Sequence, residues 1–76
     1  MRELVDFLAK SLVDDADAVR IHSHDREGTT VLELEVAPDD LGKVIGRQGR
    51  TARAIRTVLA AGGQKTRRRY VLDILD

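Results

Sequence analysis

The sequence predicts one α+β domain in which helices cover one face of a three-stranded sheet, with the elements in the order α-β-β-α-α-β. Three observations lead to this fold class. The chain has 76 residues, which suffice for one small core spanning residues 1–76 and not for two. Two segments repeat apolar residues at helical spacing, and three others alternate apolar with polar residues as half-buried strands do. Hydrophobic residues at 42% and charged residues at 34% are typical of a folded chain.

The first element is predicted to be an amphipathic helix from Arg2 to Val13. Leu4, Phe7, Leu8 and Leu12 recur at the spacing of one helical face, so these four side chains are expected to be buried. The acidic cluster that begins at Asp14 is expected to end the helix.

The second and third elements are predicted to form a β-hairpin. Residues 18–24 alternate with a period of two and direct Val19 and Ile21 to one face. Residues 25–28 are expected to form the turn. The second strand is expected from Thr29 to Val36, and its inward side chains are Leu32, Leu34 and Val36.

A short helix is predicted from Asp39 to Ile45. Pro38 presets a helical φ angle, and the two aspartates that follow it can cap the helix or match its dipole. Gly46 is expected to end this helix.

The last two elements are predicted to be a longer helix and a closing strand. The helix is expected from Arg50 to Ala61, with Gly62 and Gly63 as its C-terminal break and Ala52, Ile55 and Leu59 on its buried face. Arg50, Arg53 and Arg56 fall on the opposite side. The strand is expected from Arg67 to Leu75, with Tyr70, Leu72 and Ile74 facing inward.

Charge is distributed very unevenly along the chain, although the formal net charge is zero. Residues 1–41 carry four basic and eleven acidic side chains, residues 42–69 carry nine basic and no acidic ones, and residues 70–76 add two acids. Such asymmetry indicates one face suited to a polyanion. A solvated run of charge without a partner is the alternative interpretation.

The most specific motif is Gly46-Arg47-Gln48-Gly49, between the two predicted helices. Glycine accepts positive φ angles and lets another backbone approach closely, and backbone N–H groups at a helix start bind anions. Arg47 and Gln48 add a charge and hydrogen-bond donors at the tip, while Lys43 and Arg50 flank it. The motif therefore predicts a phosphate site, although the two glycines alone would also fit an ordinary tight turn.

Several other functions are disfavoured by the residues present. The spacing of a P-loop fails because Arg47 stands where its second glycine belongs, and no Gly-x-Gly-x-x-Gly run exists. The chain has no cysteine, which fits a reducing cytoplasm, and His22 and His24 lack a third metal ligand at suitable spacing. We therefore expect no enzyme activity, no metal and no cofactor. No apolar segment approaches the ~18 residues of a membrane span, and the N-terminus does not have the pattern of a signal peptide.

The segment Val44-Ile45-Gly46-Arg47-Gln48-Gly49-Arg50 resembles the signature of the KH domain, whose GXXG loop clamps the backbone of about four single-stranded nucleotides. The α-β-β-α-α-β order is that of the type II KH fold. Along essentially all 76 residues the chain is similar to the KhpA type of small, single-KH bacterial RNA-binding protein. The resemblance implies that RNA contacts come from eight residues: Lys43, Ile45, Gly46, Arg47, Gln48, Gly49, Arg50 and Arg53.

The same resemblance implies a cellular role. Proteins of this type bind cellular RNA in the cytoplasm as RNA chaperones or post-transcriptional regulators. They pair with themselves or with a larger KH protein, KhpB, and influence cell length and peptidoglycan homeostasis. The alternative interpretation is a dimerisation or protein-interaction module whose RNA contacts are incidental.

Overall fold

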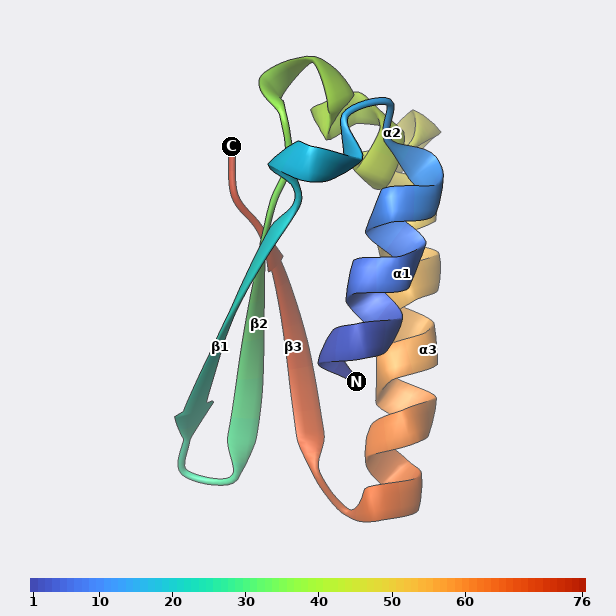
Figure 1. The fold of residues 1–76 in the computed structure, drawn as a ribbon. Coiled ribbons are helices and arrows are strands. Elements are labelled where there is room, and N and C mark those ends of the chain that lie inside the picture. Colours follow the sequence, from blue (N-terminus) through green and yellow to red (C-terminus); the bar gives the residue numbers. More distant parts are fainter.

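The computed structural model describes residues 1–76 and has three helices packed on one face of a three-stranded sheet (Figure 1). The elements are α1 (Arg2–Leu12), β1 (Arg20–Arg26), β2 (Thr29–Glu35), α2 (Leu41–Ile45), α3 (Arg50–Thr66) and β3 (Arg69–Ile74). Single 3-10 turns precede β1, α2 and α3, at Ala16–Ala18, Pro38–Asp40 and Arg47–Gly49. The predicted α+β fold class and element order are confirmed.

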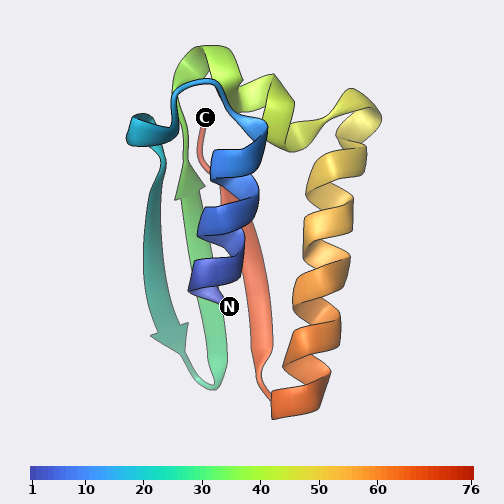
Figure 2. The same cartoon turned by 45° about the vertical axis from the view of Figure 1, so that its right-hand side comes forward.

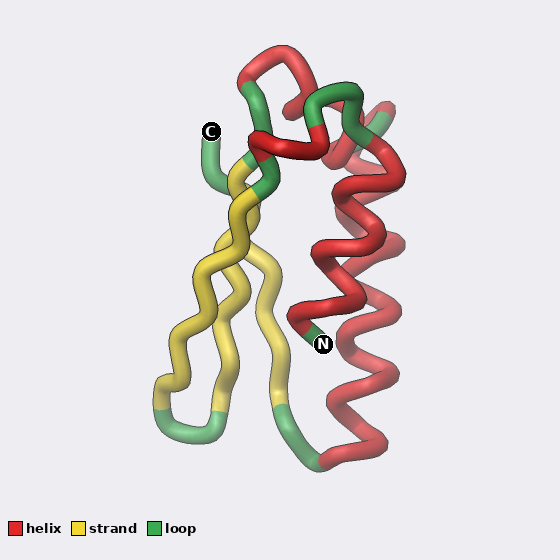
Figure 3. The backbone as a smooth tube through the Cα atoms, in the orientation of Figure 1, coloured by secondary structure: helices red, strands yellow, loops and turns green.

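The sheet has the strand order β1-β2-β3, and all its strands lie on one side of the helical layer (Figure 3). β1 and β2 are antiparallel, with Ile21 opposite Leu34. β2 and β3 are parallel, with Leu32 opposite Leu72. Since parallel strands need a crossover connection, the chain leaves β2, passes through α2 and α3, and returns as β3 at the sheet edge.

The hairpin turn is shorter than predicted. It consists of Glu27 and Gly28, whose φ angles of 51° and 84° are both positive. A two-residue hairpin turn needs positive φ angles at both residues if its twist is to match that of the two strands. Asp25 and Arg26, expected in the turn, belong to β1 because they pair with Thr30 and Thr29. β1 therefore runs two residues later than predicted at both ends.

The core lies between the sheet and the helices and contains eleven buried hydrophobic residues. The inward side chains predicted for the hairpin, Val19, Ile21, Leu32, Leu34 and Val36, are all buried. On β3, Leu72 is buried while Tyr70 and Ile74 are partly buried. The period-two prediction is thus confirmed on all three strands.

The predicted buried face of α1 is confirmed only in part: Leu4 and Leu8 are partly buried, and Leu8 packs against the core. Val5 and Ala9 are buried, with 1% of each exposed, whereas Phe7 is 66% and Leu12 39% exposed. The buried stripe continues to the partly buried Val13, so it lies one residue later than predicted, a rotation of about 100°.

α3 continues five residues beyond its predicted end, and the two glycines lie inside it. A Cβ at Gly62 would overlap the Met1 side chain, and one at Gly63 would overlap the carbonyl oxygen of Arg68. These glycines therefore permit close packing rather than ending the helix. The helix ends instead at Arg67, which has a left-handed φ of 56°.

Candidate functional site

The Gly46–Gly49 turn joins α2 to α3 at the end of the molecule farthest from the β1–β2 turn (Figure 2). Gly46, Gln48 and Gly49 have φ angles of 78°, 57° and 73°. A Cβ at Gly46 would lie 2.7 Å from Cβ and 2.8 Å from N of Thr51, whereas one at Gly49 would have only Arg53 Nη2 nearby, at 3.8 Å. Gly46 is therefore required by both φ and space, and Gly49 by φ alone.

The tip of the turn is surrounded by arginines. Arg47 and Gln48 are exposed. Arg50 Nη2 donates to Gln48 Oε1 at 3.2 Å, and Arg53 Nη2 donates to the Gln48 carbonyl oxygen at 2.9 Å. No carboxylate forms an ion pair with any of these three arginines. Their positive charge is thus available beside the turn.

Lys43, on α2, is bound differently from these arginines. Its Nζ donates to Asp14 Oδ2 at 2.5 Å and to Asp40 Oδ1 at 3.1 Å. Hydrogen bonds to these two carboxylates raise the pKa of the Lys43 ammonium group above its usual value. The Lys43 charge is therefore matched within the protein, and the contact ties α2 to the segment after α1.

Asp40 does not cap α2 as predicted, since no side-chain cap bond is present. Its buried carboxylate instead accepts the Asp15 backbone N–H at 3.0 Å and the Lys43 ammonium group. The Asp15 N–H, followed by Lys43, lowers the pKa of the Asp40 carboxyl below its usual value. A side chain predicted to act within its own helix therefore connects two distant segments.

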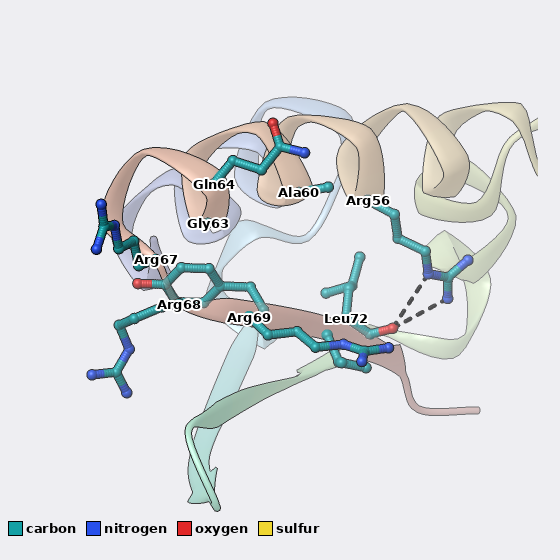
Figure 4. A pocket seen from close by; sticks show the side chains of 10 residues that line it. Arg56, Ala60, Gly63, Gln64, Arg67, Arg68, Arg69 and Leu72 are labelled. Atoms are coloured by element: carbon teal, nitrogen blue, oxygen red, sulfur yellow. Dashed lines mark hydrogen bonds between the residues drawn. The ribbon is translucent and has the colours of Figure 1, made fainter.

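A groove of about 630 Å³ lies between α3 and β3 (Figure 4). Its walls consist of Arg56, Ala60, Gly63, Gln64, Arg67, Arg68, Arg69, Tyr70, Val71 and Leu72. Arg53, Arg56 and Ala60 recur at helical spacings of three and four residues, so one stripe of α3 leads from the turn to the groove, and Arg67 follows at the C-cap of the helix. At 1.5 Å per residue, Arg53 and Arg67 are about 21 Å apart along the helix axis.

The groove arginines, Arg56, Arg67, Arg68 and Arg69, are not among the site residues that the sequence predicts. Arg56 Nε and Nη2 both donate to the Leu72 carbonyl oxygen, at 3.4 and 3.3 Å (Figure 4). Arg68 instead donates to Asp25 Oδ1 at 3.1 Å and to Thr30 Oγ1 at 2.9 Å, which directs it toward the hairpin. Two features of the sequence could have identified these arginines. One is the helical spacing from Arg53 to Arg56, and the other is the basic run Arg67-Arg68-Arg69 that leads into β3.

A second hollow, of about 260 Å³, lies between α1 and α3. Its lining has no charged side chain and consists of Leu8, Ser11, Leu12, Thr51, Ala54, Ile55 and Val58. Val58 is 46% exposed, and Phe7 projects from α1. We call Phe7, Leu12 and Val58, together with this hollow, the α1–α3 apolar surface. It lies on a different side of α3 from the basic groove.

The outer sheet face and the helices have two further features that bear on function. On the outer sheet face His24 Nε2 lies 2.7 Å from Glu33 Oε1 and His22 Nε2 3.9 Å from Glu35 Oε1. No group of three potential ligand side chains is arranged to hold a metal ion. None of the helices has the length and apolar character needed to cross a membrane.

Comparisons with known proteins agree with this architecture. A family model described as "KhpA/KhpB, KH domain" matches residues 2–74. The RNA-binding protein KhpA of Borreliella burgdorferi is 54% identical over 74 residues, which cover 97% of this chain and 90% of that protein. The proteins of the same name from Halalkalibacterium halodurans and Aquifex aeolicus are each 51% identical over 76 residues, covering this chain fully and 100% and 96% of theirs. No solved structure gives a significant match.

Proposed function

The chain belongs to the KhpA/KhpB family of KH domains, and on that premise we propose that it binds single-stranded RNA by clamping the RNA backbone with the Gly46–Gly49 turn. The observation that carries the proposal is the positive-φ turn with three arginines that have no carboxylate partner beside it. Phosphate oxygens are acceptors with negative charge, and this arrangement offers donors and positive charge. Nothing in the proposal requires catalysis, and the family is not enzymatic.

The proposed contacts divide by their chemistry. The Gly46 and Gly49 backbone and the Arg47 and Gln48 side chains meet phosphates, while Arg50 and Arg53 supply further positive charge. Lys43 adds a positive charge from α2, although its ammonium group is already hydrogen-bonded to Asp14 and Asp40. Ile45 is partly buried and packs against the core, so it anchors the start of the turn to the core.

The proposed biological role follows from the family resemblance. It is that of a cytoplasmic RNA chaperone or post-transcriptional regulator, acting with a KhpB-type partner in cell-length and peptidoglycan homeostasis. Deletion of the chain's gene, complemented with wild-type or turn-mutant protein, tests whether cell length depends on RNA binding. Normal cell length in cells with the turn mutant would show that the effect on cell length does not depend on RNA binding at the turn.

RNA affinity is expected to fall with salt along a log–log line. A footprint of about four nucleotides places about three phosphates in contact, so a slope near −2 is expected at roughly 0.7 per phosphate. Filter binding of an eight-nucleotide single-stranded RNA at 50 to 300 mM salt measures this slope. A slope of zero would mean that the arginines beside the turn do not meet phosphates.

A second function, self-association, is favoured by the α1–α3 apolar surface. We propose that a second copy of this chain covers it. Phe7, Leu12 and Val58 are large apolar side chains that solvent contacts in the monomer, and burying them favours association. The charged side chains of α3 are all basic, whereas those of α1 balance as two acids and two bases, so the apolar side chains carry this proposal. In a two-fold contact each copy presents this same surface, so the exposed apolar side chains of both copies are buried together.

Val58→Lys is expected to abolish self-association, because it places a charge in the centre of the covered surface. Val71→Lys is the matched control, since Val71 is a similarly exposed valine on β3, away from α1. Sedimentation equilibrium from micromolar to near-millimolar protein measures both variants. The surface assignment is overturned if both variants associate equally, and self-association itself is overturned if the wild type stays monomeric throughout.

A further inference from the structure

We propose that the Asp14 carboxylate competes with RNA phosphate for Lys43, so that Asp14 weakens RNA binding and leaves Lys43 when RNA binds at the turn. This inference rests on the proposed function, because it concerns the affinity of the same site. Three features of the structure support it: the carboxylate partners of Lys43, the different exposure of those two partners, and the position of Lys43 one helical turn before Gly46.

Lys43 is the one basic side chain of the proposed RNA site whose charge is matched within the protein. The three arginines at the turn form no ion pair with a carboxylate. Lys43 Nζ, in contrast, donates to Asp14 Oδ2 at 2.5 Å and to Asp40 Oδ1 at 3.1 Å. Asp14 belongs to the connection after α1, which passes beside α2 at the same end of the molecule as the turn (Figure 2). A contact from outside the RNA site therefore holds one of its cations.

The two carboxylates that hold Lys43 differ in how firmly the protein holds them. The Asp40 side chain is 4% exposed, and its Oδ2 accepts the Asp15 backbone N–H at 3.0 Å. That N–H, followed by Lys43, lowers the pKa of the Asp40 carboxyl, so Asp40 remains ionised at neutral pH. The Asp14 side chain is 85% exposed, and Lys43 is its only hydrogen-bond partner. Because water and salt screen exposed ion pairs, Asp14 is the partner that can be exchanged.

A phosphate at the turn is expected to replace Asp14 rather than Asp40. Lys43 precedes Gly46 by three residues, which is about 4.5 Å along a helix axis. Its ammonium group has three donors on a flexible stem, so it can keep Asp40 while it turns from Asp14 to a phosphate. If Asp14 stayed in place, three anions would surround one ammonium group and would repel one another. The cost of breaking the Asp14 contact is then subtracted from the RNA affinity.

Asp14→Asn tests this competition, because it removes the charge and keeps the size of the side chain. It is expected to tighten binding of an eight-nucleotide single-stranded RNA on the order of threefold in fluorescence anisotropy at 100 mM salt. Asp17→Asn is the matched control. Asp17 is exposed in the same connection between α1 and β1, and its side chain forms no ion pair. The control changes the net charge equally and is expected to tighten binding less than about 1.5-fold, because salt screens a charge that contacts no cation of the site.

Lys43→Gln then shows whether Asp14 acts through Lys43. This variant loses one phosphate contact and is expected to bind RNA about fivefold more weakly than wild type. In the Lys43→Gln background, Asp14→Asn is expected to tighten binding no more than Asp17→Asn does.

The inference is overturned if Asp14→Asn and Asp17→Asn tighten binding equally, or if the Asp14→Asn gain persists with Lys43→Gln, since net charge alone would then account for it. Weaker binding by a folded Asp14→Asn protein would also overturn it, because the ion pair would then support the turn instead of competing with RNA. Each of these results leaves the proposed function intact as long as wild type binds RNA. No RNA binding by wild type overturns both.

Discussion

Replacing Arg47 and Gln48 together by aspartate is expected to reduce the affinity for single-stranded RNA at least 100-fold. The change removes one positive charge and places two carboxylates where the proposed site holds phosphates. A hydrogen bond to a charged group contributes about 1.5–3 kcal/mol, so losing two such bonds is equivalent to roughly 100-fold or more before repulsion is counted. This is the largest effect that we expect on RNA binding.

The fold is expected to survive this double substitution. Both side chains are exposed, and exposed substitutions usually change the free energy of unfolding by less than about 0.5 kcal/mol. Gln48 has a left-handed φ of 57°, a conformation that aspartate accepts more readily than most residues. Circular dichroism and thermal unfolding measure this directly.

The single variants Arg47→Asp and Arg26→Asp give a matched comparison, because each changes the net charge by the same amount. Arg26 lies at the end of β1, next to the hairpin turn and far from the Gly46–Gly49 turn (Figure 1). Fluorescence anisotropy with labelled RNA is expected to detect a large loss only for Arg47→Asp. If the folded double variant binds RNA as the wild type does, the turn is not the RNA site.

Gly46→Ala is expected to destabilise the protein more than any other single change at the turn. Gly46 has φ 78° and ψ 168°, a combination that essentially only glycine adopts, and forcing another residue into it costs on the order of 1–3 kcal/mol. The new Cβ would also approach N and Cβ of Thr51 to 2.8 and 2.7 Å, at the first turn of α3. Together we expect about 3 kcal/mol, which lowers Tm by roughly 15 °C in a domain of this size.

Gly49→Ala separates backbone strain from crowding. Gly49 also has a positive φ, but a Cβ there meets nothing closer than Arg53 Nη2 at 3.8 Å. Only the left-handed conformation is then penalised, at about 1–2 kcal/mol. Thermal unfolding of the two variants is expected to give a clearly larger Tm decrease for Gly46→Ala. Equal decreases in Tm would show that crowding against Thr51 adds nothing to the cost of a side chain at position 46.

Local patterns in the sequence determined the elements and the turn. Alternation with period two identified the inward side chains of β1 and β2, because successive residues of a strand point to opposite faces wherever that strand packs. The two glycines of the Gly46–Gly49 turn were informative for a similar reason, since positive φ is a property of single residues. The RNA contacts assigned to that turn remain predictions, and its geometry is compatible with them.

Tertiary structure alone decided the features that depend on a distant neighbour. The hydrophobic stripe of α1 was misplaced by one residue because Val5 and Phe7 are both apolar, and only docking on the sheet determines which is buried. Gly63 lies inside α3, where the missing Cβ leaves room for the Arg68 carbonyl. The groove that contains Arg56 exists only because β3 returns beside α3, so its residues, distant in sequence, form one surface through a contact that no local periodicity encodes.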